Sequence, residues 1–104
     1  MTLCIRTDTH TLVYQLRRTE VFDDWLLDLR DVRAKARILA RLGNLGDVRS
    51  VGDGVSEMRV DVGAGYRAYF TWRQRVVIIL LCGGDKSGQA RDIARAKQMV
   101  HEIE

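Results

Sequence analysis

The sequence predicts a small, single α+β domain, in which an N-terminal strand and a helical hairpin precede an antiparallel three-strand meander and a C-terminal helix. Residues 57–62 and 66–73 alternate between apolar and polar side chains, the period-two pattern of half-buried strands. Residues 76–82 are continuously apolar and rich in β-branched side chains, which is typical of a strand covered on both faces. Apolar residues recur at helical spacing on both sides of this region. Strands flanked by helices in this order indicate the α+β class.

Length and composition bound the domain organisation. A chain of 104 residues with 46% hydrophobic and 30% charged residues is expected to fold as one compact domain rather than stay disordered. The net charge of +3 permits an anionic partner without requiring one. We expect a loose N-terminal extension at 1–11, with a short strand at 3–5, and the folded domain at 12–104.

The N-terminal half predicts a strand followed by two helices. The strand is expected at 12–16, and Thr19 can cap the first helix. That helix carries an apolar face made of Phe22, Trp25, Leu26 and Leu29. The second helix is expected to end at about Leu42 and to bury Val32, Ala36, Leu39 and Leu42 or their neighbours. An acidic first helix beside a basic second one suggests weak pairing, and 43–54 is expected to be a turn and loop.

The meander has one apolar and one polar face. The polar face carries Arg59, Arg67 and Arg73, with Tyr69 beside Arg67. Lys86 lies where the central strand ends and the last helix begins, near free backbone N–H groups that attract anions. The two tryptophans, Trp25 and Trp72, occupy apolar-face positions and are expected in the core.

The cysteines and histidines show no metal-ligand spacing, so we expect neither a metal nor a cofactor. Cys4 and Cys82 are interpreted as buried or incidental thiols in a reducing compartment. The two histidines are His10 and His101. No apolar run approaches the ~18 residues of a membrane span, and the N-terminus lacks the apolar centre of a signal peptide. A cytoplasmic protein without membrane contact is expected.

Several motifs together resemble the RelE/ParE superfamily of toxins. They are Gly-Asn-Leu-Gly-Asp at 43–47, Ser-Glu-Met-Arg at 56–59, Gly-Tyr-Arg-Ala-Tyr-Phe at 65–70, and Leu-Leu-Cys-Gly-Gly-Asp-Lys-Ser-Gly-Gln at 80–89 followed by Asp-Ile-Ala-Arg-Ala at 92–96. The chain is most similar to the HigB-like, phage Gp49-related branch of addiction-module killer proteins. The resemblance covers about 13–101 and implies a RelE-like fold.

The resemblance implies the toxin of a type II toxin–antitoxin system. Many such toxins are metal-independent mRNA endonucleases that act on the translating ribosome. A cognate antitoxin, often a HigA-like helix-turn-helix protein in this branch, neutralises them. ParE-type members inhibit DNA gyrase instead, and a catalytically inactive antitoxin-binding or nucleic-acid-binding module is a further alternative, because superfamily membership does not fix the target.

An RNase of this type needs groups that bind phosphate and move protons while the RNA 2′-hydroxyl attacks. Arg67 matches an active-site arginine of the family and is our candidate phosphate clamp. The proposed catalytic residues are Arg67, Lys86, Tyr69 and Asp92, with His101 considered as a further proton-transfer group. The proposed RNA-binding residues are Arg59, Arg67, Arg73, Lys86 and Arg91. The acidic Glu57 and Asp61 depart from RelE, which has extra basic residues on this strand.

Overall fold

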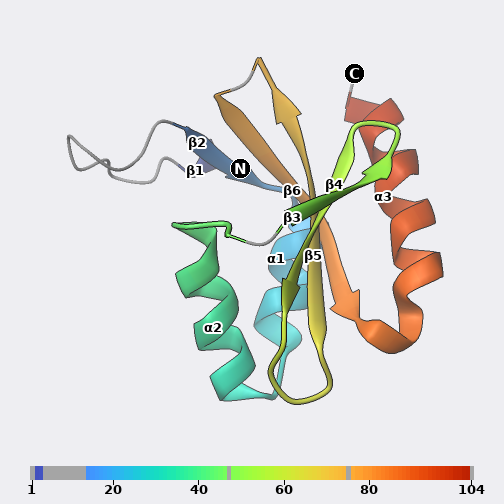
Figure 1. Ribbon diagram of the computed structural model, residues 1–104. Helices are drawn as coiled ribbons and strands as arrows, with labels where there is room; N and C mark the ends of the chain where they lie inside the picture. Colours follow the sequence, from blue (N-terminus) through green and yellow to red (C-terminus); the bar gives the residue numbers. More distant parts are fainter. Residues whose placement is uncertain (1, 4–13, 47, 75, 104) are drawn as a thin grey trace.

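A computed structural model of the chain describes residues 2–3, 14–46, 48–74 and 76–103 (Figure 1). Within these residues one mixed sheet of six strands has the order β1-β2-β6-β5-β4-β3. The strands are β1 (Thr2–Leu3), β2 (Gln15–Arg18), β3 (Val48–Gly52), β4 (Val55–Val60), β5 (Tyr66–Arg73) and β6 (Val77–Asp85). The helices are α1 (Glu20–Asp28), α2 (Val32–Leu42), the 3-10 turn η1 (Lys86–Gly88) and α3 (Gln89–Ile103). The predicted α+β class is confirmed.

The sheet is mixed because β2 runs parallel to β6, whereas the other pairs are antiparallel. The meander β4-β5-β6 is confirmed. The first strand lies at Gln15–Arg18, later than the predicted 12–16, and Thr2–Leu3 pairs with it. Residues 4–13, which include Cys4, His10 and most of the predicted extension, lie outside the described part of the chain.

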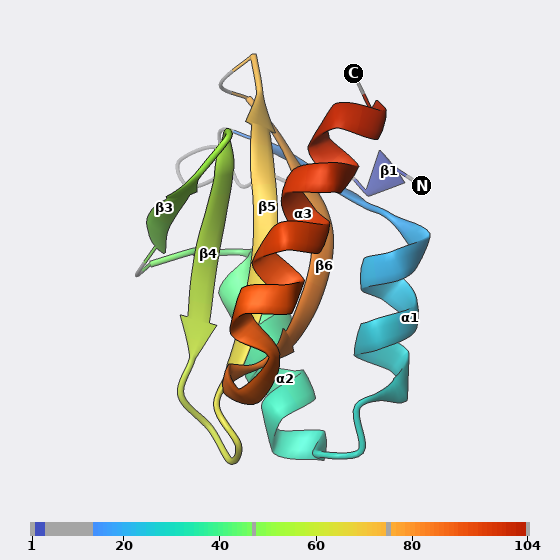
Figure 2. The same ribbon diagram turned by 90° about the vertical axis from the view of Figure 1, so that its right-hand side faces the viewer.

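Helices cover both faces of the sheet (Figure 2). The hairpin α1–α2 packs on one face around Phe22, Ile38 and Phe70. Helix α3 packs on the other face around Tyr69, Leu81 and other buried residues, including Cys82. The expectation that β4 and β5 are half-buried was therefore wrong, because α3 also covers much of their polar face, where Glu57, Tyr69 and Thr71 are buried.

The hairpin begins as predicted. The Thr19 side chain accepts a hydrogen bond from the Phe22 N–H and donates one to the Leu81 carbonyl, so it caps α1 and ties it to β6. The predicted apolar face of α1 packs into the core, including Trp25. Asp31 caps α2 in the same way by accepting from Ala34 N–H.

Two apolar assignments were wrong. Helix α2 buries Leu42 as expected, but it buries the neighbouring Ala34 and Ile38 in place of Val32 and Leu39, which are 76% and 46% exposed. The buried residues and the predicted ones form two different apolar stripes along α2, so helical periodicity alone could not show which stripe faces the core. Trp72 is 42% exposed although it makes an edge-to-face contact with Tyr14, because it lies near the end of β5.

The predicted loop at 43–54 is partly wrong, since Val48–Gly52 forms the edge strand β3. Its residues are mostly exposed and its pairing with β4 is irregular between Ser50 and Gly52. Such a strand lacks the alternating apolar pattern that would predict it. Its position at the sheet edge brings Arg49 opposite Glu57.

Gly83 is required by the packing of α1 on β6. A Cβ added there would collide with the Trp25 ring. We expect Gly83→Ala to destabilise the fold by about 1–3 kcal/mol through overpacking. Gly43→Ala is the matched control, because its Cβ would lie 3.7 Å from the Ala40 carbonyl and its φ is −83°. Urea denaturation should show a lower midpoint for Gly83→Ala alone; equal midpoints would contradict this packing.

Candidate functional site

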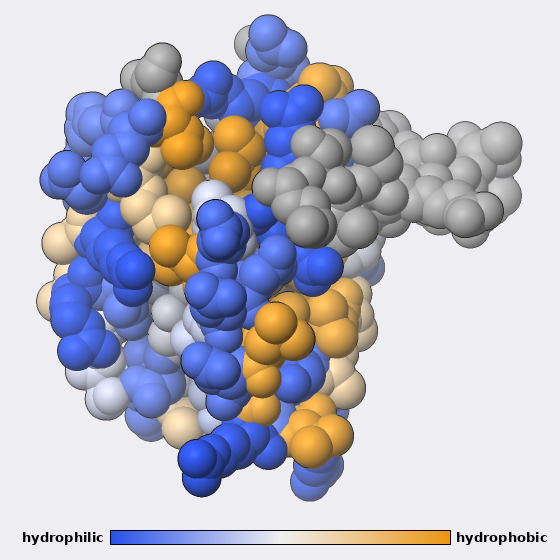
Figure 3. Space-filling model, turned by 180° about the vertical axis from the view of Figure 1, so that it is seen from behind, coloured by the Kyte–Doolittle hydropathy of each residue, from blue (hydrophilic) through white to orange (hydrophobic). Residues whose placement is uncertain are grey.

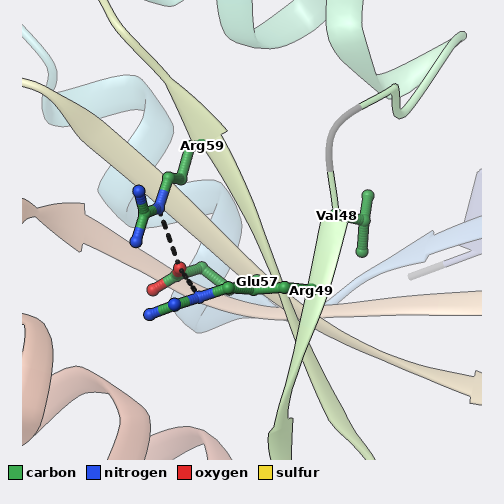
Figure 4. A pocket seen from close by; sticks show the side chains of 4 residues that line it. All are labelled: Val48, Arg49, Glu57 and Arg59. Carbon is green, nitrogen blue, oxygen red and sulfur yellow. Dashed lines mark hydrogen bonds and ion pairs between the residues drawn. The ribbon is translucent and has the colours of Figure 1, made fainter.

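A fully buried carboxylate, Glu57 on β4, lies at the centre of an arginine cluster. Its Oε1 is 3.1 Å from Arg49 Nε and 3.2 Å from Arg59 Nε, and its Oε2 is 3.4 Å from Arg67 Nε. Figure 4 shows Arg49 and Arg59 converging on Glu57 from neighbouring positions of the β3–β4 ribbon. We call Arg49, Arg59 and Arg67 together the arginine cluster.

The strand register places these groups together. Arg49, Glu57 and Tyr69 lie in one cross-strand row over β3, β4 and β5. Arg59 and Arg67 form the next row. Directly paired residues of antiparallel strands project to the same face, about 5 Å apart at Cβ. The positions of the arginine cluster therefore follow from the pairing of β3, β4 and β5. Because these residues lie on strands, their backbone is held rigidly.

Two neutral groups complete the coordination of Glu57. The Tyr69 hydroxyl donates to Oε2 at 3.3 Å, and the Gln89 side-chain amide donates to Oε2 at 2.9 Å. Tyr69 is itself fully buried, and Gln89 is the first residue of α3. Because buried carboxylates need such partners, this arrangement also fixes the start of α3 over the sheet.

The surroundings keep Glu57 ionised. Burial works to raise its pKa, but hydrogen bonds from Arg59, Gln89 and Arg49 outweigh burial and lower the pKa below its ordinary value. Burial raises the pKa of Tyr69, and the nearby charge of Glu57 raises it further. Tyr69 therefore stays protonated at neutral pH and acts as a hydrogen-bond donor.

The cluster presents an anion-binding surface. Three guanidinium groups surround one carboxylate, which leaves an excess of positive charge. The side chains of Arg49 and Arg59 are 57% and 41% exposed. With Val48 and Glu57 they line a pocket of about 100 Å³, several times the ~30 Å³ that one water occupies. Guanidinium groups fixed in this way suit phosphate oxygens.

Arg67 is the most enclosed arginine of the cluster, with its side chain 12% exposed. Its Nε is buried and makes no hydrogen bond to any described residue, although it lies within ion-pair distance of Glu57. A buried donor without a hydrogen bond is costly. A ligand that draws the side chain into better geometry would remove that cost.

Asp92 lies on the same face as Arg67. Gly84 pairs with Arg67, and the Asp92 carboxylate fills the space where a Gly84 Cβ would stand. Asp92 is 8% exposed, and burial raises its pKa, although the adjacent Arg91 opposes this. A carboxyl group with a raised pKa beside an anion site is suited to donate a proton.

The raised pKa of Asp92 implies that its ionised form weakens the fold. Below its unfolded pKa the group is protonated in both states, and the penalty appears as pH rises through the folded pKa. Asp92→Asn should therefore raise the urea midpoint at pH 7 and have little effect near pH 3. Asp28→Asn, on exposed α1, is the control. A midpoint unchanged or lowered at pH 7 would contradict the assignment.

The other predicted site residues divide into two groups. Lys86 is exposed in η1, with its side chain alongside Gly65, and Arg91 is exposed at the start of α3. Both lie at the end of the sheet that carries Arg67.

The second group lies far from Arg67. Arg73 lies six residues further along β5, about 20 Å away at strand spacing, and its Nη2 donates to the Ile103 carbonyl at 2.8 Å. His101 lies in the last turn of α3, about 18 Å from Gln89 along the helix.

Sequence reasoning missed three members of the site. Arg49 was placed in a loop, Glu57 was treated as a departure from a basic pattern, and Gln89 was not considered. The spacing of Glu57 and Arg59 around the buried Met58 places both on one face of the strand, but the sequence does not show that Glu57 is buried there. The contact with Gln89 depends on how α3 returns over the sheet, which no local pattern encodes.

Other kinds of site do not stand out among the described residues. No group of three or more histidine, cysteine or acidic side chains within them is arranged to hold a metal ion. None of the helices that they form is long and apolar enough to cross a membrane.

The chain matches a known protein family over most of its length. Residues 24–101 match the model of the phage-derived Gp49-like proteins (DUF891). The chain belongs to this Gp49-like family. A relative from Haemophilus influenzae strain Rd, described as an uncharacterized protein, is 47% identical over 97 residues, covering 88% of this chain and 98% of the relative. The Gp49-like segment contains Glu57, the whole arginine cluster and Asp92.

Proposed function

We propose that this Gp49-like protein is the toxin of a type II toxin–antitoxin pair and that it cleaves mRNA without a metal ion. The Gp49-like family is related to toxin-like addiction modules, which supports the toxin role. The observation that carries the nuclease proposal is the arginine cluster anchored on buried Glu57. The cluster offers several guanidinium groups to the phosphates of an RNA backbone. The net charge of +3 is too mild to favour an anionic partner by itself.

In this proposal the cluster binds the phosphate at the cleaved bond. Arg67 and Arg59 are directly paired across β4 and β5, so both can reach one phosphate group. Arg49 extends the positive surface toward the sheet edge, where the neighbouring nucleotide would lie. Lys86 and Arg91 are exposed at the same end and would contact the RNA backbone further along.

The proposed chemistry uses the RNA 2′-hydroxyl as the nucleophile. Its oxygen loses a proton to solvent water and bonds to phosphorus, and the bond from phosphorus to the 5′-oxygen breaks. Guanidinium groups stabilise the charge that develops on the phosphate. Asp92, whose pKa is raised by burial, is our candidate for protonating the departing 5′-oxygen. Tyr69 holds Glu57 and thereby positions the arginine cluster.

The proposal includes partners and a location. The substrate is mRNA on the ribosome in the cytoplasm, and a cognate helix-turn-helix antitoxin neutralises the toxin. The family relationship supports an antitoxin partner.

A cell-free translation reaction with an end-labelled mRNA tests the function. The expected products end in a 2′,3′-cyclic phosphate and a 5′-hydroxyl, because the 2′-oxygen is the nucleophile. The same mRNA without a start codon is the control, and it should stay intact if the ribosome presents the substrate. A supercoiling reaction with purified DNA gyrase is run in parallel. Intact mRNA together with inhibited gyrase would refute the nuclease proposal and favour the ParE-type alternative.

A further inference from the structure

Helix α2 is apolar on two faces, but the domain buries only one of them. Ala34, Ile38 and Leu42 face the core. A second stripe at i, i+4 and i+7 is exposed and comprises Val32, Ala36 and Leu39. Val32 and Leu39 are 76% and 46% exposed. A helix within one domain needs a single apolar stripe, so the second stripe has no role in this fold.

Helix α1 adds a further exposed apolar residue beside this stripe. Leu27 is 72% exposed, and its carbonyl accepts a hydrogen bond of 3.3 Å from Lys35 Nζ on α2, which holds the two helices together at this point. Figure 3 shows apolar residues gathered on this part of the molecule. We call Leu27, Val32, Ala36 and Leu39 the hairpin surface. Clustered exposed apolar residues of this kind mark interaction surfaces.

Charges of opposite sign flank the hairpin surface. Exposed acids on α1 include Asp24 and Asp28, and exposed bases on α2 include Arg33 and Arg37. Among the described residues no ion pair joins α1 to α2; the ion pairs are Arg18–Asp23, Arg91–Asp92 and those of Glu57. The expected pairing between an acidic and a basic helix is therefore not made inside the molecule, and both sets of charges remain able to pair with another molecule.

We propose that the hairpin surface binds a second copy of this chain and forms a two-fold symmetric dimer. A two-fold interface uses the same patch on both partners, so the patch must be complementary to itself. The hairpin surface meets this condition, because acidic α1 of one copy can face basic α2 of the other across the apolar residues. A partner helix of a single charge sign would match only one side of it.

This dimer is compatible with an accessible arginine cluster. The hairpin covers one face of the sheet and α3 lies on the other (Figure 2). Glu57 and the arginines that contact it lie on the α3 face, where Gln89 of α3 donates to Glu57. Each copy would present its cluster away from the interface. The proposal does not depend on what the cluster binds, since it rests on α1 and α2 alone.

Sedimentation velocity with two complementary double variants tests the dimer. One variant carries Asp24→Lys and Asp28→Lys, so the exposed charges at these four flanking positions are all basic; the other carries Arg33→Glu and Arg37→Glu, so they are all acidic. All four positions are exposed, and each variant should fold. We expect wild type to dimerise reversibly, each variant alone to associate at least about tenfold more weakly, and an equimolar mixture of the two to recover dimerisation.

Apolar variants give a second, independent test. Val32→Ser should weaken the dimer, whereas Val76→Ser is the matched control because Val76 is 47% exposed beside the β5–β6 turn. The proposal is overturned if wild type remains a monomer into the high-micromolar range, which would leave the hairpin surface to a different protein such as an antitoxin. It is also overturned if the mixture associates no better than either variant alone.

Discussion

Arg67→Ala should lower the rate of mRNA cleavage by about 10²–10³-fold, the usual effect of removing one preorganised group that stabilises charge in the transition state. Arg67 is held on central strand β5 with its side chain mostly enclosed, so water cannot replace it easily. Its removal leaves Glu57 with Arg49, Arg59, Tyr69 and Gln89 as partners. The variant should therefore fold, and the loss should fall on kcat rather than on stability.

Two further substitutions make this result specific. Arg67→Lys keeps the charge but loses the planar, bidentate geometry, and should recover only part of the activity. Arg73→Ala removes an arginine from the same strand about 20 Å away and should leave cleavage unchanged, because Arg73 binds the Ile103 carbonyl. Equal loss in Arg67→Ala and Arg73→Ala would indicate a general charge effect and contradict a local phosphate site.

Glu57→Gln should destabilise the protein by about 3 kcal/mol, at the lower end of the cost of breaking a buried ion pair. The substitution keeps the size of the side chain but removes the charge that compensates three guanidinium groups. The cost is not larger because Arg49 and Arg59 remain partly exposed to water. The arginines should also lose their common anchor, so RNA affinity should fall despite the gain in positive charge.

The pH dependence of the Glu57→Gln effect distinguishes an ionic role from a packing role. The folded-state pKa of Glu57 is lowered, so its contribution is fully present above its unfolded value and is lost as pH falls through the folded pKa. Urea midpoints of wild type and variant should therefore converge in acid. Glu102→Gln, on an exposed turn of α3, should change the midpoint little at any pH. A constant difference between wild type and Glu57→Gln from neutral pH to acid would contradict the ionic role.

The fold could be predicted where the signal is local. The cap at Thr19, the period of α1 and the existence of strands β4 and β5 follow from adjacent residues, and the structure confirms these elements. The half-buried pattern expected of β4 and β5 is not observed, because both of their faces are largely buried. The buried face of α2 could not be predicted, because both stripes are apolar and only tertiary packing selects Ile38 over Leu39. The edge strand β3 carries no apolar alternation and forms through its pairing with β4.

Part of the candidate site could likewise be predicted from local sequence, and part of it could not. Arg59 and Arg67 could be placed on one face from alternation, and the structure pairs them. Alternation also places Arg73 on that face, but it gives no limit on distance along the strand, and Arg73 lies at the far end. The centre of the site is Glu57, whose burial comes from α3, a helix more than 30 residues later in the chain. A carboxylate surrounded by positive charge therefore becomes visible only in three dimensions.

Mapping of mRNA 5′ ends in a bacterial host within minutes of induction tests the central claim most directly. Wild type and Arg67→Ala are compared at equal protein levels. The arginine cluster as an RNA phosphate site predicts new 5′ ends inside translated regions that appear with wild type and are absent with Arg67→Ala. Growth arrest by wild type with an unchanged set of mRNA ends, or the same new ends with both proteins, would contradict it.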